Sequence, residues 1–235
     1  MITGIIVALP EELRTLTKSK LAQGEYTQLS ANTLVILAGA GAKNAASASL
    51  KLIAQGAQQL ISWGCAGALA PDLQAGDIII PHSILGQDNN SLAAHKHWQQ
   101  QSIKILEPCL KCYNGQLLES ATVISLAHDK TQQFQRSNAL AVDMESAAIA
   151  RIAAQNNRPF IAIRSIVDAA QFDLPNAINY ALNNQGTVIV SKLIKYLCLH
   201  PSELVPLIQL GLHFKAANRS LTQIAQQLPR ITQAS

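Results

Sequence analysis

Residues 159–168 read PFIAIRSIVD, and this stretch decides the fold. It is almost entirely apolar, which is typical of a strand buried on both faces at the centre of a parallel sheet. A carboxyl follows at once, because Asp168 ends the run. Ligands bind at the carboxyl ends of strands in such sheets, so the stretch predicts both a central strand and a site.

Other short apolar runs alternate with segments of helical spacing. The expected strands lie at 2–9, 33–38, 59–63, 77–81 and 140–142, a further ordered segment at 122–126, and helices at 45–55, 145–155 and from residue 11. This alternation predicts an α/β fold with a mixed, mostly parallel central sheet flanked by helices. Residues 64–67 (GCAG) are expected to form a glycine-rich turn, and residues 86–118 an irregular excursion over the surface.

The length allows one sizeable core. We expect an α/β core at 1–199 and a C-terminal helical extension at 200–235, packed on the core or on a partner. From residue 175 the pattern is helical, with breaks at Pro201 and Pro206.

The composition is apolar, with 49% hydrophobic and 14% charged residues and a mean hydropathy of +0.15. So low a charge content suggests that part of the surface is covered by a second subunit, a hydrophobic ligand or a membrane. The alternative is a monomer with an apolar composition. The net charge is +4, but the basic residues are scattered, so nucleic-acid binding is not expected.

The first residues lack the basic start of a secretory signal and soon meet Pro10 and two glutamates. The nearest approach to a bilayer span, residues 187–199, is short and contains Lys192 and Lys195. We expect a cytoplasmic protein, with a peripheral contact to the inner membrane as a further option.

No metal site is expected. The four cysteines are Cys65, Cys109, Cys112 and Cys198. Cys109 and Cys112 form a C-x-x-C, and His95 and His97 lie upstream, but neither pair has the arrangement of a zinc knuckle. Reduced thiols in a polar loop explain the pattern equally well.

Three acidic segments are candidates for chemistry. Asp168 can be a general acid, since partial burial would raise its pKa, or it can cap the following turn. Asp143 and Glu145, where a strand passes into a helix, can accept hydrogen bonds from ligand hydroxyls or simply favour a helix start. Glu12 can orient a water molecule, or it can belong to a helix start that follows Pro10.

Gly39 and Gly41 follow the second expected strand and allow the backbone to approach an anion, with Lys43 adding charge. A dinucleotide fingerprint would need a third glycine, and Asn44 stands in its place. A nicotinamide cofactor is therefore not expected.

Together the segments resemble the purine nucleoside phosphorylase and nucleosidase superfamily. The matching stretches are 4–12, 39–41, 63–69, 76–81, 141–148 and 159–168, in the family's order. The resemblance implies an enzyme that breaks the N-glycosidic bond between a purine and a ribose. It also implies no cofactor, with inorganic phosphate or water as co-substrate, and a transition state resembling an oxocarbenium ion.

The resemblance assigns roles residue by residue. Asp168 matches the acid that protonates the purine, and Glu145 matches the carboxylate that holds the ribose hydroxyls. Met144 matches the residue packed beside the ribose. Glu12 matches the acid that activates water in nucleosidases, and Gly41 matches the loop near the nucleophile.

Further positions follow from the same resemblance. Gly64, Cys65 and Asp143 are expected at the substrate, and His128 lies near the place of the family's purine-stacking loop. Arg164, on the strand entering the site, is read as structural support. Residues 82–121 form a shorter middle section than nucleosidases have.

The chain also departs from the family pattern. Pro10 interrupts an acidic cluster, Cys65 and Val167 replace common serines, and Ser62 and Trp63 stand where phosphorylases often have an arginine. The missing arginine leaves Gly41 and Lys43 as the expected phosphate-binding residues.

Residues 200–204 (HPSEL) open an apolar tail similar to the C-terminal extension of hopanoid-biosynthesis-associated nucleoside phosphorylases. That similarity implies phosphorolysis of adenosylhopane, an adenosine with a polycyclic lipid at its 5′ carbon, with release of adenine. Alternatives are hydrolysis of methylthioadenosine, S-adenosylhomocysteine or futalosine, and non-catalytic nucleoside binding. Relatives are usually dimers or larger, so a homodimer is expected.

Overall fold

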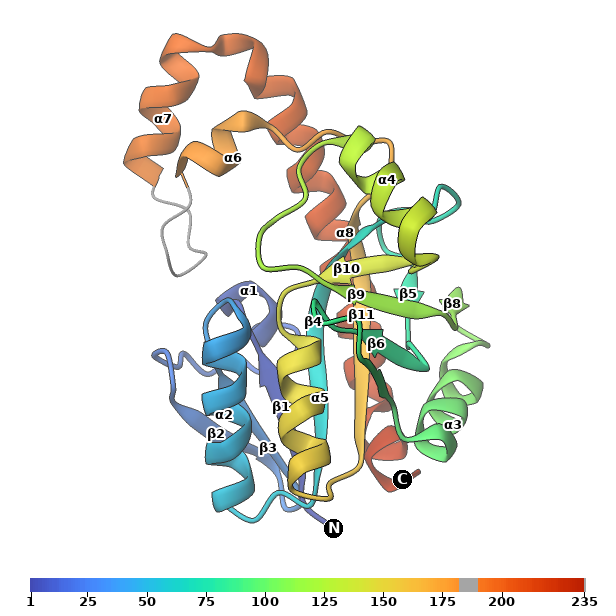
Figure 1. Ribbon diagram of the computed structural model, residues 1–235. Coiled ribbons are helices and arrows are strands. Elements are labelled where there is room, and N and C mark those ends of the chain that lie inside the picture. The colour runs from blue at the N-terminus through green and yellow to red at the C-terminus, as the bar shows by residue number, and fades with distance from the viewer. Residues whose placement is uncertain (182–189, 235) are drawn as a thin grey trace.

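Strand β4 (Gln59–Ala68) runs through the middle of the sheet in the computed structural model, which describes residues 1–181 and 190–234 (Figure 1). It lies between β1 (Thr3–Val7) and β11 (Phe160–Asp168), both parallel to it. Its last residues pair with β10 (Ala141–Asp143) in the antiparallel sense. Strand β4 therefore joins two parts of the sheet.

The other strands are β2 (Tyr26–Ser30), β3 (Thr33–Leu37), β5 (Ile78–Ile79), β6 (Ser83–Leu85), β7 (Ser91–Ala93), β8 (Cys112–Tyr113) and β9 (Gln116–Glu119). The main path is β2-β3-β1-β4-β10-β9-β6-β7, while β11 pairs with β4 and β5, and β8 pairs with β5. Parallel pairs outnumber antiparallel ones. The predicted fold class is confirmed.

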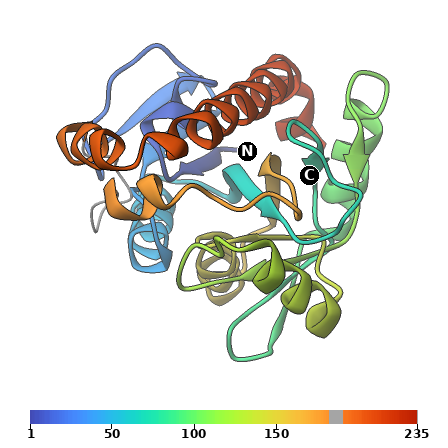
Figure 2. The ribbon, with the colours of Figure 1, turned by 90° about the horizontal axis from the view of Figure 1, so that it is seen from above.

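Helices cover both faces of the sheet. Helices α2 (Ala42–Ala54) and α5 (Ser146–Gln155) pack on each other and on one face, around one apolar core. Helices α3 (Lys96–Leu106) and α8 (Leu204–Gln233) enclose a second core on the other face (Figure 2). The remaining helices are α1 (Pro10–Leu13), α4 (Ala127–Ser137), α6 (Asn176–Ala181), α7 (Val190–Leu199) and the 3-10 helix η1 (Pro201–Glu203).

Strand β11 carries a β-bulge near its end. Residues 160–166 face residues 60–66 of β4 one by one, but Asp168 faces Gly67, so Val167 is the extra residue. The bulge sets the Asp168 carboxyl beside Gly67.

Two predictions for the middle of the chain are wrong. Residues 64–67 are not a turn but part of β4, because β11 and β10 supply strand partners there. Residues 86–118 contain β7, α3, β8 and β9 rather than an irregular excursion. Polar residues hid the amphipathic pattern of α3, since Gln99 and Ser102 share its buried face with Trp98 and Leu106.

Smaller differences have local causes. An additional edge strand, β2, precedes the strand predicted at 33–38. The helix expected from residue 11 is only four residues long, and residues 122–126 form neither strand nor helix. Pro206 does not interrupt the helix, because it lies in the first turn of α8, where a backbone N–H has no helical acceptor. Residues 182–189 of the predicted helical segment lie outside the described residues.

The second half of α8 belongs to the core. Leu221, Ile224 and Ile231 are fully buried against the sheet and α3. The Trp98 indole N–H donates to the Ile231 carbonyl at 2.7 Å, which ties α3 to the end of the chain. The first half of α8 is more exposed, and the domain boundary at residue 199 stays a prediction. In the described ranges no helix combines the length and apolarity needed to cross a membrane.

Replacing Ile224 by alanine is expected to lower the free energy of unfolding by about 2–5 kcal/mol, because it opens a cavity in the second core. Leu212, on the same helix, is 62% exposed, so Leu212→Ala should change it by about 0.5 kcal/mol or less. Urea denaturation measures both. Equal effects would contradict the burial of this half of α8.

Candidate active site

Five charged side chains gather where β1, β4, β10 and β11 end. All are nearly inaccessible: Glu12, Asp143, Glu145, Arg164 and Asp168 are at most 9% exposed. Strands β1 and β11 run parallel to β4, so their carboxyl ends meet at one edge of the sheet. Gly67 of β4 pairs with Val142 on one side and with Asp168 on the other. The segment holding Asp143 and Glu145 and the Asp168 carboxyl therefore flank the same end of β4.

Arg164 is the centre of this group. Its Nε donates to Asp143 Oδ2 at 2.7 Å, and its Nη2 donates to Ser62 Oγ at 2.6 Å and Ser146 Oγ at 3.1 Å. Asp143 also accepts from Ser146, through the backbone N–H at 3.2 Å and the hydroxyl at 2.5 Å. The ion pair thus ties β11 to β4, β10 and the start of α5. Arg164 supports the site as expected, and Asp143 also serves the helix start that was its alternative role.

Glu12 is held by three backbone amides. Its Oε2 accepts from Ala8 and Leu9 N–H, each at 3.0 Å, and its Oε1 accepts from Cys65 N–H at 2.8 Å. Burial raises the pKa of Glu12 above its ordinary value, although Arg164 and these amides oppose the rise. The result is a carboxyl fixed in orientation and made more basic.

Glu145 stands at the N-cap of α5 and joins that helix to α2. Its Oε1 accepts from Gly41 N–H at 2.8 Å, while Oε2 receives no donor among the described residues. Gly41 has a φ of 95°, which a residue with a side chain adopts only with strain. Burial, and secondarily the Asp143 charge, raise the pKa of Glu145 to about 7.

Asp168 has a partner that the sequence analysis missed. Its Oδ2 accepts from the Nζ of Lys130, a fully buried residue of α4, at 2.5 Å. Burial raises the pKa of Asp168, and Lys130 opposes the rise. Lys130 lies in a polar stretch, AHDKTQQFQRS, where no local pattern distinguishes a buried lysine from an exposed one.

Two glycines of β4 make room for these groups. A Cβ at Gly64 would collide with the Glu12 carboxylate and the Arg164 guanidinium. A Cβ at Gly67 would lie 3.2 Å from both carboxyl oxygens of Asp168, which is tighter than an ordinary contact. Between them, the half-buried Cys65 has a thiol whose pKa burial raises well above its ordinary value, so the thiol is neutral.

A family model described as the phosphorylase superfamily matches residues 3–117 and 110–195. The chain belongs to the phosphorylase superfamily. A 5′-methylthioadenosine/S-adenosylhomocysteine nucleosidase of Anoxybacillus flavithermus is 26% identical over 229 residues, which cover 86% of this chain and 92% of the relative. The chain is therefore an enzyme of the nucleoside phosphorylase and N-glycosyl hydrolase class, not a binding protein without catalysis.

Solved structures share the fold. A Helicobacter pylori methylthioadenosine nucleosidase mutant, with 5′-methylthioadenosine in the active site, has a TM-score of 0.73 at 16% identity and covers 99% of this chain and 98% of its own. Futalosine hydrolase of Helicobacter pylori has a TM-score of 0.70 at 17% identity, covering 98% and 97%. At such identities the likeness establishes the architecture.

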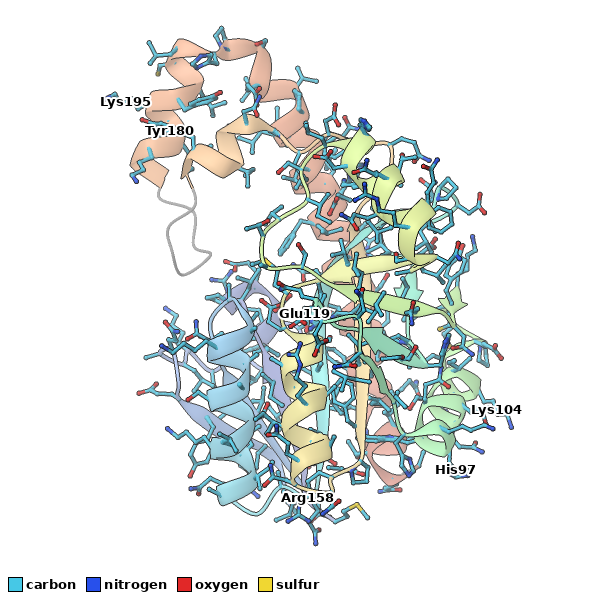
Figure 3. All side chains as sticks on the ribbon, in the orientation of Figure 1. His97, Lys104, Glu119, Arg158, Tyr180 and Lys195 are labelled. Carbon is cyan, nitrogen blue, oxygen red and sulfur yellow. The ribbon has the colours of Figure 1, made fainter. Side chains whose placement is uncertain are left out.

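Three further residues predicted to bind substrate or phosphate are less buried than the charged group. Met144 is half-buried between Asp143 and Glu145, whereas Lys43, in the first turn of α2, and His128, on α4, are exposed. Their roles stay predictions. Within residues 1–181 and 190–234, no three His, Cys, Asp or Glu side chains converge as metal ligands. His97 lies on α3, away from this edge of the sheet (Figure 3).

Replacing Arg164 by methionine is expected to destabilise the protein by about 3–5 kcal/mol, because Asp143 would be left as a buried, unmatched charge. Arg14→Met is the control, since Arg14 makes only an exposed pair with Glu11. Its effect should stay below about 0.5 kcal/mol. Urea denaturation distinguishes the two, and adding Asp143→Asn to Arg164→Met should recover part of the loss.

Glu145 should make stability depend on pH. Folding raises its pKa from 4.5 to about 7, so its protonated form is favoured in the folded state. The resulting stabilisation is complete below pH 4.5 and is lost as pH rises towards about 7. Wild type should therefore lose stability relative to Glu145→Gln, which does not titrate, as pH rises through this window; denaturation at several pH values measures this. A gain of wild-type stability over Glu145→Gln with rising pH would contradict the shift.

Proposed function

We propose that the protein hydrolyses the N-glycosidic bond of a 5′-substituted adenosine and releases adenine. The observation that carries the proposal is the pair of buried carboxyls, Asp168 and Glu145, on either side of the end of β4. A carboxyl whose pKa is raised can hold a proton and deliver it to a leaving base. A carboxylate beside the sugar can bind its hydroxyls and stabilise the positive charge that develops there.

In the proposed reaction, the bond between C1′ and the purine nitrogen breaks as a bond from C1′ to a water oxygen forms. Asp168 gives its proton to the departing base, and Glu12 accepts a proton from the water. The amides of Ala8, Leu9 and Cys65 keep the Glu12 carboxylate in one orientation, which suits a residue that positions water. Met144 would pack beside the ribose, with Gly41, Gly64 and Cys65 around it. No cofactor takes part.

The charge balance favours water over phosphate as the nucleophile. Among the described residues of this edge, both buried cations are already paired, Arg164 with Asp143 and Lys130 with Asp168, while Glu12 and Glu145 form no ion pair. A phosphate dianion placed there would find neither cation unpaired. Asp143, whose oxygens are both engaged by Arg164 or Ser146, would act by holding the site together. His128 is proposed to lie near the base.

A second candidate is phosphorolysis of an adenosine with a lipid at its 5′ carbon, such as adenosylhopane, with Gly41 and Lys43 binding the phosphate. The helical arm formed by α6, α7 and the first half of α8 favours it. The arm extends beyond the carboxyl ends of the strands (Figure 1) and exposes large apolar side chains. They are Ile194, Leu199, Leu204, Val205, Ile208 and Leu212.

The charge on the arm agrees with contact to an anionic lipid surface. Among its described residues, Lys192, Lys195 and Lys215 are basic and Glu203 alone is acidic. Lys195 and Tyr180 lie on the arm (Figure 3). Three partners could cover these apolar side chains. They are a hydrophobic 5′ group of the substrate, the second subunit of a homodimer, and the cytoplasmic face of the inner membrane.

An adenine-release assay tests both candidates, run on methylthioadenosine, S-adenosylhomocysteine and a lipid-linked adenosine, with and without phosphate. Hydrolysis predicts release without phosphate and a free sugar product. A strict phosphate requirement with a sugar 1-phosphate product would replace it by phosphorolysis. Size-exclusion chromatography and vesicle flotation test the homodimer and the membrane contact.

Asp168→Asn should lower turnover at least about 100-fold, which is the scale for losing a general acid. Asp72→Asn is the matched control, because the Asp72 side chain is exposed and forms no hydrogen bond or ion pair among the described residues. Glu145→Gln should reduce turnover as well as binding, since its hydrogen bonds strengthen as the sugar becomes cationic. Steady-state kinetics on the best substrate measure these effects. Full turnover in Asp168→Asn would refute the assignment of the acid.

A further inference from the structure

Lys130 is an ammonium buried out of contact with solvent, with all three of its hydrogens directed at acceptors. Its Nζ donates to Asp168 Oδ2 at 2.5 Å, to the Phe172 carbonyl at 2.7 Å and to the Ala169 carbonyl at 3.2 Å. Removing an ammonium from water costs several kcal/mol, and an ion pair recovers that cost only with good geometry. A buried lysine at this position therefore needs an explanation.

Fastening α4 to the loop after β11 does not require it. Two other hydrogen bonds already join these segments: Ala127 N–H donates to Asp173 Oδ1 at 2.6 Å, and Leu174 N–H donates to the Ser125 carbonyl at 2.8 Å. Neither needs a buried charge. Lys130 differs from them in reaching the carboxyl of Asp168 itself.

We infer that Lys130 is a positioning residue for the proton transfer by Asp168, an inference that rests on the proposed function. By occupying Oδ2, the ammonium leaves Oδ1 to carry the proton that goes to the base. As the proton departs, Asp168 becomes a carboxylate, and the ammonium beside it stabilises the new charge. The proton passes from Oδ1 to the base nitrogen, and Lys130 itself gains and loses none.

Burial and Lys130 act in opposite directions on the pKa of Asp168. Burial alone would hold the proton tightly, and the ammonium weakens that hold, so Asp168 can be both protonated and ready to donate. The other titratable groups beside Asp168 are Cys65 of β4 and His213 of α8, whose ring contacts Phe172 at 5.1 Å between centroids. Neither is bonded to the Asp168 carboxyl, so Lys130 is the direct partner.

Lys130→Met tests the inference, with Lys130→Arg retaining the charge and Gln132→Met, at an exposed position of the same helix, as the control. Lys130→Met should lower kcat about 10- to 100-fold, part of the contribution of a general acid. The fall of activity at high pH reports loss of the Asp168 proton, and without the ammonium the pKa of Asp168 rises further. The pH at which activity falls on the alkaline side should be higher in Lys130→Met than in wild type, and close to wild type in Lys130→Arg and Gln132→Met.

A lysine with only a structural role would lower activity without changing that pH, and that result would overturn the inference. The Asp168→Asn background is a second check: adding Lys130→Met there should change the residual rate less than about twofold if the lysine acts through the acid. A further large loss would also overturn it. If Lys130→Met does not fold, Lys130→Gln keeps a donor for the two carbonyls and carries the same predictions.

A readout without turnover separates this inference from the proposed function. Carboxyl ¹³C NMR titration of aspartate-labelled protein should show a higher pKa for Asp168 in Lys130→Met than in wild type. If wild type releases no purine from any substrate while the NMR shift is present, the proposed function fails but the pairing holds. If turnover is normal and the pKa of Asp168 is the same in both proteins, the inference fails alone.

Discussion

The buried guanidinium of Arg164 is the constraint on which the site depends. A charge held between strands must be matched and fully bonded, and here Asp143, Ser62 and Ser146 satisfy it. Those partners come from β10, β4 and α5, so one ion fixes the relative position of three elements. Because α5 begins beside Asp143, its N-cap residue Glu145 is held where it meets the Gly41 amide of α2.

The three buried carboxyls of the site, Glu12, Glu145 and Asp168, differ in their hydrogen-bond partners. Glu12 is clamped by amides, Glu145 has one oxygen free of protein donors among the described residues, and Asp168 is bonded to an ammonium. Burial raises the pKa of all three, but each has a different set of opposing partners. The different tasks proposed for these chemically similar residues rest on their surroundings rather than on residue type.

The sequence was informative where local pattern and tertiary structure agree. The apolar run ending in Asp168 predicted the central strand and the place of this carboxyl at its end, because a strand buried on both faces leaves a clear signature. The sequence-based prediction was wrong at residues 64–67. Glycines normally indicate a turn, but here they lie inside β4 and let neighbouring charged side chains approach its backbone closely. The prediction failed again at Lys130, since the docking of α4 against the loop after β11 is a tertiary event without a local signal. The polar buried face of α3 hid that helix in the same way.

The β-bulge at Val167 has a consequence for the direction of the Asp168 side chain. Side chains on a strand point alternately to opposite sides, so in an unbroken ladder position 168 would point to the same side as 164 and 166. The extra residue reverses this parity, and Asp168 takes the orientation that would otherwise belong to its predecessor. A change in strand pairing by one residue, with no change in composition, therefore decides the direction in which the proposed proton donor points.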